Sequence, residues 1–156
     1  MANTEKATAI EIIGVQKLLK ALSKIDKELQ KDVRDASGAI ADDLVSGARQ
    51  AAHTPVQVLA ASGLKVRRDR VPVVASGKGK VGHRSTPIPA IFYGAEFGGQ
   101  RRPTTLQFAS HKGRDGYFLY PTARARGKRY ADMWGDAIDK AFKAWDDKSA
   151  KGMTNG

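Results

Sequence analysis

The chain has 156 residues, the size of one ordinary domain, and a formal net charge of +11. It has no cysteine, which excludes a disulfide scaffold, a zinc–cysteine site and thiol catalysis. Its three histidines are scattered, which argues against a metal site. No signal-peptide pattern opens the chain and no apolar run is long enough for a membrane span, so we expect a soluble, unexported protein.

The first predicted elements are a short strand and an amphipathic helix. Ile10 and Ile12 lie on one face of an extended segment that Gly14 ends. From there apolar residues recur every three or four positions, as on one side of a helix. Gly38 and the region from Asp32 to Asp35 could divide this helix in two. Thr54-Pro55 predicts its end, because the residue before proline disfavours helical backbone. The apolar positions are Val15, Leu18, Leu19, Leu22, Ile25, Leu29, Val33, Ala36, Ile40, Leu44, Val45 and Ala48.

Between residues 56 and 121 the helical period is lost, and glycine and proline become frequent. Leu64 and Val66 predict one strand, and residues 71–75 predict a second. The stretch "TTLQFASHKGRDGYFLYP", residues 104–121, contains two β-prone runs around a polar loop and predicts a hairpin. After Pro121 the helical period returns and continues to Trp145.

This order predicts an α+β fold, in which N-terminal helices and a long C-terminal helix pack on one face of a mainly antiparallel β-sheet with long basic loops. We expect a single domain over residues 1–148. Residues 149–156 are polar and small, which predicts a flexible tail.

The positive charge is concentrated in the middle of the chain. Residues 64–130 hold 15 Lys and Arg against 3 Asp and Glu, whereas the segments on either side are close to neutral. This distribution favours a surface that meets nucleic acid or an acidic protein, with a solubilising face as the alternative. No helix-turn-helix, zinc-finger or RNP signature accompanies the charge, so sequence-specific recognition is not supported.

The stretch "GKGKVG" matches the G-x-G-x-x-G pattern of dinucleotide-binding proteins at Gly77, Gly79 and Gly82. That pattern works when the glycines lead into a helix whose N-terminus receives the pyrophosphate. Here Pro87 and Pro89 follow, and we expect them to prevent a regular helix. The stretch is therefore predicted to be a basic loop, and nucleotide binding is the weaker alternative.

Catalytic patterns are also weak. No G-x-S-x-G motif occurs, and the carboxylates of Asp42-Asp43 and Asp146-Asp147 are adjacent on helices, so each pair diverges and is predicted to be solvated. Glu96 is the one acidic residue amid aromatics. It could be catalytic, but pairing with Arg101, Arg102 or an arginine of a neighbouring subunit is favoured. We predict no catalytic, cofactor-binding or metal-binding residues.

Five segments, taken in order and spacing, resemble one protein family: the neck or tail-completion proteins of long-tailed bacteriophages, which are minor tail components at the head-to-tail junction. The similarity extends over about residues 8 to 147. The segments are "IEIIGVQKLLKALSKI", "ASGAIADDLVSGARQAAHTP", "ASGLKV", "FYGAEFGG" and "YFLYPTARARGKRYADMWGDAIDKAF". Ser62 comes seven positions after Pro55, and the loop over 76–89 is long and basic, which are departures from the family pattern.

The resemblance implies a non-enzymatic structural virion protein that is assembled in the host cytoplasm. It implies a homo-oligomeric ring, with six copies as our expectation, between neighbouring connector and tail-terminator or tail-tube proteins. Genomic double-stranded DNA would pass through its channel; no membrane, cofactor or small-molecule substrate is implied. Only Glu96, Phe97 and Gly98 transfer as a matched motif, with a structural or inter-subunit role.

Many unpaired cations in a channel would hold DNA that must slide, because affinity for duplex DNA depends on the number of phosphates neutralised. We therefore predict that some central cations pair with carboxylates of adjacent subunits. A non-specific DNA-binding protein that uses residues 64–130 is the alternative function, and an enzyme that uses a nucleotide is the third. The predicted inter-subunit or DNA-facing cations are Lys65, Arg67, Arg68, Arg70, Lys78, Lys80, Arg84, Arg101, Arg102, Arg124 and Arg126.

Overall fold

The computed structural model describes residues 27–68, 72–77, 79–81, 85–99 and 107–153, and its fold is α+β, as predicted. The predicted strand at Ile10 and Ile12 and the predicted helical residues 15–26 lie outside the described residues. In chain order the elements are α2 (Lys27–Ala51), α3 (Pro55–Ser62), β1 (Leu64–Arg68), β2 (Pro72–Ser76), β3 (Lys80–Val81), β4 (Thr86–Pro87), α4 (Ile88–Phe97), the 3-10 turn η2 (Gly113–Asp115) and α5 (Leu119–Met153).

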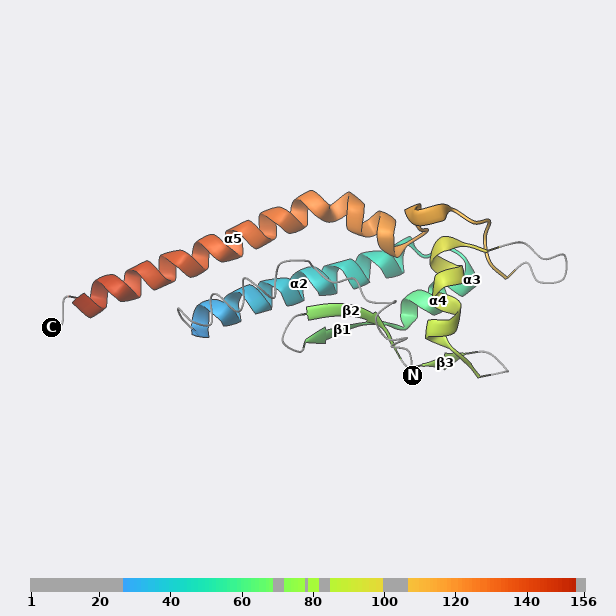
Figure 1. Ribbon diagram of the computed structural model, residues 1–156, viewed down its shortest axis with the longest axis horizontal. Coiled ribbons are helices and arrows are strands. Elements are labelled where there is room, and N and C mark those ends of the chain that lie inside the picture. Colours follow the sequence, from blue (N-terminus) through green and yellow to red (C-terminus); the bar gives the residue numbers. More distant parts are fainter. Residues whose placement is uncertain (1–26, 69–71, 78, 82–84, 100–106, 154–156) are drawn as a thin grey trace.

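Two long helices, α2 and α5, lie side by side along the length of the molecule (Figure 1). The apolar positions predicted for α2 are buried from Leu29 to Ala48, except for Ala36, which is half-buried. The possible division near Gly38 does not occur, since α2 is continuous from Lys27 to Ala51. Gly38 is itself buried, and a Cβ built there would lie 3.5 Å from the Arg68 guanidinium, which is ordinary van der Waals contact.

The predicted pair of strands is confirmed as an antiparallel hairpin of β1 and β2, with Leu64 opposite Ser76 and Val66 opposite Val74. Leu64 is fully buried and Lys65 is exposed, so the strand alternates between the helices and solvent. A second antiparallel pair, β3 with β4, follows in the chain.

Although the helical period is lost between residues 56 and 121, two helices, α3 and α4, lie there. Helix α2 ends at Ala51, three residues before Thr54-Pro55. Thr54 is instead the N-cap residue of α3. Its hydroxyl accepts a hydrogen bond from the Gln57 backbone N–H, and the Gln57 side chain accepts one from the Thr54 N–H, which is a capping box.

Helix α4 also overturns the argument from Pro87 and Pro89. It begins at Ile88 directly after Pro87, and Pro89 lies in its first turn. Proline is tolerated there, because the first N–H groups of a helix have no partner within it.

The predicted hairpin over residues 104–121 was wrong in its described part. Residues 107–118 form turns and the short η2, and the aromatic run "YFLYP" leads directly into α5, which begins at Leu119. Helix α5 continues to Met153, so the chain stays helical within the segment predicted to be a flexible tail.

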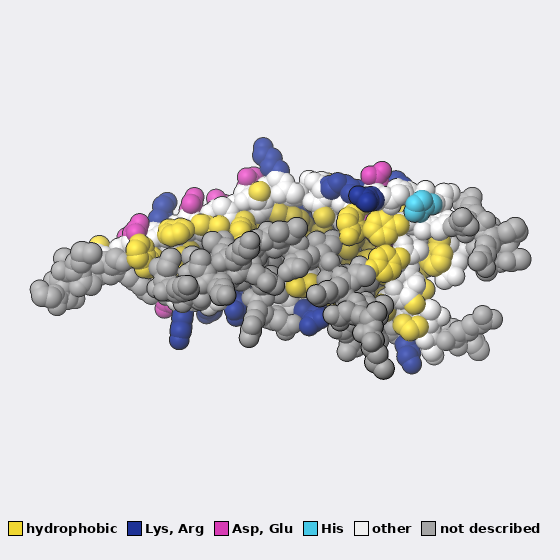
Figure 2. Space-filling model, in the orientation of Figure 1, with side chains coloured by type: hydrophobic (Ala, Val, Ile, Leu, Met, Phe, Trp, Pro, Cys, Tyr) yellow, Lys and Arg dark blue, Asp and Glu magenta, His cyan; other side chains and the backbone are white. Residues whose placement is uncertain are grey.

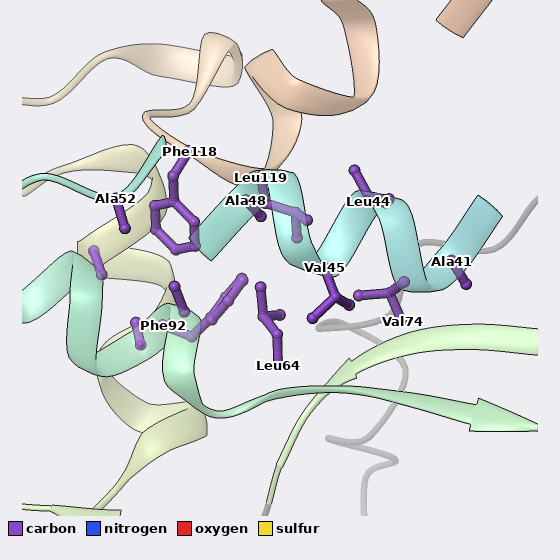
Figure 3. Packing of buried hydrophobic residues seen from close by; sticks show 13 residues of the cluster. Ala41, Leu44, Val45, Ala48, Ala52, Leu64, Val74, Phe92, Phe118 and Leu119 are labelled. Atoms are coloured by element: carbon purple, nitrogen blue, oxygen red, sulfur yellow. The ribbon is translucent and has the colours of Figure 1, made fainter. Parts of the chain in front are cut away.

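The main core lies where α2, α4, the first turn of α5 and the β1–β2 hairpin meet (Figure 3). Phe118 and Leu119 enter it from the start of α5, Phe92 from α4 and Leu64 from β1; each is at most 2% exposed. The rings of Phe92 and Phe118 meet edge to face, with centroids 5.7 Å apart. This core therefore fixes the junction between α4 and α5.

Candidate functional site

The carboxylate of Glu96, at the end of α4, caps the N-terminus of α5. Its Oε2 accepts hydrogen bonds from the backbone N–H groups of Phe118, at 3.3 Å, and Leu119, at 3.0 Å. Its Oε1 accepts one from the Tyr120 N–H at 2.9 Å. Glu96 is fully buried within its own chain. Arg101 and Arg102, which we expected as possible partners, lie outside the described residues.

Burial raises the pKa of Glu96, and the backbone hydrogen bonds oppose this shift without cancelling it. The approach of the carboxylate depends on Gly116, which has a φ of +72°. A Cβ at Gly116 would overlap the Glu96 carboxylate. A glycine is therefore required here both by its backbone and by the side chain packed against it.

Gly98, the last residue of the matched motif, turns the chain out of α4 with a φ of +77°. Backbone hydrogen bonds join this turn to residues 109–112. The Gly99 N–H donates to Ala109 O and the Lys112 N–H donates to Phe97 O, both at 2.9 Å. The Tyr117 hydroxyl donates to Ser110 O at 2.7 Å. Residues 96–98 thus join α4, the 107–117 segment and α5 in one junction.

Phe97 lies in the middle of an aromatic row at the surface of this junction. Its ring centroid is 6.3 Å from that of Tyr93 in a stacked arrangement, and 5.2 Å from that of Tyr120. Tyr93 and Tyr120 are 40% and 37% exposed. Burial and the neighbouring Tyr120 raise the pKa of Tyr93. The row is a rigid apolar surface with hydroxyl groups, a combination enriched at protein interfaces.

A second polar cluster joins α2 to α5 around Asp43, which we expected to be solvated. The Asp43 carboxylate accepts hydrogen bonds from Arg126 Nη1 at 2.7 Å and from the Tyr130 hydroxyl at 2.8 Å. Arg129 approaches its other oxygen at 3.5 Å. The Arg126 guanidinium lies against Gly47, where a Cβ would come within 2.5 Å of it. Arg126, predicted to face DNA or another subunit, therefore pairs within its own chain.

The contacts within this cluster shift the pKa values of Asp43 and Tyr130. Burial acts to raise the pKa of Asp43, but the hydrogen bonds from Tyr130 and Arg126 outweigh it, and the pKa of Asp43 is lowered. Burial and the hydrogen bond to Asp43 raise the pKa of Tyr130 to about 12. Both shifts favour the ionised aspartate beside a neutral phenol.

Replacing Tyr130 with phenylalanine should lower the free energy of unfolding by about 1 kcal/mol at neutral pH, because a hydrogen bond to a charged group is lost. The deficit should shrink as pH falls through the lowered pKa of Asp43, where protonation removes the charge that accepts the bond. It should also shrink as pH rises past 10 towards 12, where wild-type Tyr130 ionises. Urea unfolding across pH measures this; a deficit that is flat with pH would contradict it.

The other predicted cations on described residues lie on several elements. Lys65 and Arg67 are exposed on β1, and Lys80 is exposed on β3. Arg68 pairs with Asp42, both largely exposed, and Arg124 donates to the backbone oxygen of Asp115. On the face shown in Figure 2, the coloured Lys and Arg side chains are spread along the upper and lower edges. Arg70, Lys78, Arg84, Arg101 and Arg102 lie outside the described residues.

The described glycines of "GKGKVG" bond to their own chain. The Gly77 N–H donates to Gly63 O, and Gly79 O accepts from the Ile88 N–H at 2.8 Å. Although a helix does follow, β3 and β4 separate these glycines from it, and its first turn, "IPAI", has no polar side chain. The arrangement therefore differs from the strand–turn–helix that places a pyrophosphate. Gly82 lies outside the described residues.

An apolar groove of about 390 Å³ lies between α2, β2 and α5. Ile40 and Leu44 line it from α2, Val74 from β2, and Tyr130 and Trp134 from α5. The Trp134 indole N–H donates to the Ser37 hydroxyl at 2.9 Å, which fixes the ring at one end of the groove.

The fold and these contacts define an α+β domain whose two long helices are joined by polar clusters and by a carboxylate-capped junction. Comparisons with protein-family models, curated proteins and solved structures found no significant match for this chain. Over the described part of the chain, none of the helices has the length and apolar character needed to cross a bilayer. The same residues hold no group of three or more His, Asp or Glu side chains that could bind a metal.

Proposed function

We propose that this protein is a structural subunit of a bacteriophage head-to-tail connector, assembled as a ring that leaves a channel for DNA. The observation that carries the proposal is the arrangement of the matched Glu96-Phe97-Gly98 motif. Glu96 points inward and caps α5, whereas Phe97 lies between two exposed tyrosines at the surface. A fixed aromatic row of this kind is a suitable centre for a contact between subunits.

The contact is tested by Tyr120→Ala, with Tyr93→Ala as a second variant. The wild type should form closed rings, seen by native mass spectrometry and negative-stain electron microscopy. Both variants should stay folded, because the side chains of Tyr120 and Tyr93 are 37% and 40% exposed. Most of the protein should, however, no longer assemble into rings. Phe142→Ala is the matched control, since Phe142 is 42% exposed and lies outside the row. Rings that persist in both tyrosine variants would remove the aromatic row from the proposal.

Non-specific DNA binding is the second candidate, because Lys65 and Arg67 are exposed on one strand. If it is the function, the protein alone should bind random duplex DNA, and the logarithm of affinity should fall linearly with the logarithm of salt concentration. Lys65→Ala should reduce that slope by about 1 if Lys65 contacts a phosphate. Arg126→Ala should change the slope less, because Asp43 already holds that guanidinium. Absence of any gel shift at low salt would eliminate this candidate.

A further inference from the structure

One face of α5 carries apolar residues along its length, small in the first half of the helix and large in the second. Residues about 7, 11 or 18 apart share a direction on a helix, because 3.6 residues complete one turn. In the first half this face holds Ala123, Gly127 and Ala131, which line the apolar groove against α2 and β2. In the second half it holds Phe142 and Trp145, which are 42% and 38% exposed.

The groove has room for a side chain from outside. Gly127 and Ala131 are exposed, and a Cβ built at Gly127 would meet nothing within 4 Å in the described part of the chain. Glycine in a helix interior is destabilising relative to alanine, so its own chain gains nothing from it here. The groove volume of about 390 Å³ lies in the range that accepts a small organic molecule, and hence an aromatic side chain.

The large half of the face lies where α5 leaves α2. Figure 1 shows that α5 extends past the start of α2. Exposed aromatic side chains on such a helix are stabilised by burial against another apolar surface. The groove is such a surface, but it lies in the other half of the same helix, so Phe142 can reach only the groove of a second copy.

Charged residues beside this face are divided between the same two halves. Arg124 and Lys128 lie in the first half, and Asp139 and Asp146 lie in the second; all four are exposed. Their spacing places them on one flank of the apolar face, away from the contacts with Asp43 of α2. When two such helices run antiparallel, the basic flank of each copy meets the acidic flank of the other. These charges favour one orientation and register.

We propose that a second copy of the chain docks antiparallel on α5 about a two-fold axis near Gly135, with Phe142 of each copy in the groove of the other. The register that places Phe142 opposite Gly127 also places Ile138 opposite Ala131. Such a contact is isologous, because the same surface serves both copies. It goes beyond the proposed function, since it is separate from the aromatic row and does not depend on ring assembly.

Charge reversal tests the contact without changing the core. Lys128→Asp should weaken dimerisation by about tenfold or more, because like charges then face each other. Lys128→Asp combined with Asp139→Lys should restore the dimer, since the exchanged charges attract again. Lys140→Asp is the matched control, because Lys140 is exposed on the opposite side of α5. Sedimentation equilibrium measures each variant in the Tyr120→Ala background, where the proposed ring contact is removed.

A single engineered cysteine tests the two-fold axis, because the chain has no cysteine of its own. Gly135 is exposed, and a Cβ there meets nothing within 4 Å in the described part of the chain. Under mild oxidation Gly135→Cys should form mainly disulfide-linked dimers, since the two copies of this position are neighbours. Ala144→Cys, also at an exposed position, should stay mostly reduced, because the two copies of residue 144 lie far from the axis.

The contact and the proposed ring fail separately. Phe142→Ala should weaken the dimer by about tenfold or more and leave the ring intact. Tyr120→Ala should abolish the ring and leave the dimer. A monomer in the Tyr120→Ala background, no rescue by the exchanged charges, or equal disulfide yields from Gly135→Cys and Ala144→Cys would each overturn the proposal.

Discussion

Glu96→Ala should lower the free energy of unfolding by about 3 kcal/mol, because buried donors left unsatisfied cost about 1–3 kcal/mol each. The N–H groups of Phe118 and Leu119 lose their acceptor, and both residues are almost fully buried. The negative charge that complements the N-terminal end of the α5 dipole is lost as well. Urea unfolding followed by circular dichroism measures the change.

Glu28→Ala is the matched control, since Glu28 lies in the first turn of α2 and is exposed. Loss of an exposed acidic side chain near a helix N-terminus costs about 0.3–1 kcal/mol. Glu96→Gln keeps an acceptor oxygen but not the charge, and it should fall between the two. Equal losses in the free energy of unfolding for Glu96→Ala and Glu28→Ala would show that the buried cap stabilises the protein no more than an exposed acidic residue at a helix N-terminus.

The cap also separates two roles that the sequence left open for Glu96. A residue that pairs with a neighbouring subunit has to reach the surface, whereas Glu96 is fully buried in its own chain. We therefore expect Glu96→Gln to alter the stability of the monomer and of the proposed ring alike, and Tyr93→Ala and Tyr120→Ala to affect only the proposed assembly.

The elements that the sequence predicted well are those whose signal is local and periodic. The apolar stripe from Leu29 to Ala48 predicted α2, and the β-prone runs at residues 64–66 and 71–75 predicted β1 and β2. Helix α3 had an available signal in Thr54, Pro55 and Gln57, which form a capping box with proline in the first turn. Helix α4 is apolar at almost every position, so it has no amphipathic period to detect.

The start of α5 could not be found from local pattern. Tyr117, Phe118 and Tyr120 are β-prone residue types, and the run "YFLYP" favours a strand. The deciding contact is the Glu96 carboxylate, which is more than 20 residues earlier in the chain and satisfies the first N–H groups of the helix. The ion pairs of Asp42 and Asp43 are likewise contacts between distant elements, so the sequence alone predicted two solvated carboxylates.

Gly98→Ala should be at least as damaging as Glu96→Ala, with a loss of about 3 kcal/mol or more, since it combines backbone strain with a steric overlap. At a φ of +77° alanine is strained, and its Cβ would overlap the backbone oxygen of Ser110. Relief requires the 107–112 segment to move away from α4. That movement breaks the Gly99–Ala109 and Lys112–Phe97 backbone hydrogen bonds.

Gly113→Ala separates the two causes, because Gly113 also has a positive φ, +63°, but a Cβ there meets nothing within 4 Å. It should show the strain alone, about 1 kcal/mol. The difference between the variants in urea unfolding then measures the close approach of α4 to residues 109–110. If Gly98→Ala and Gly113→Ala unfold at the same urea concentration, the junction tolerates a side chain at residue 98. Glycine is then needed in the motif only for its backbone conformation.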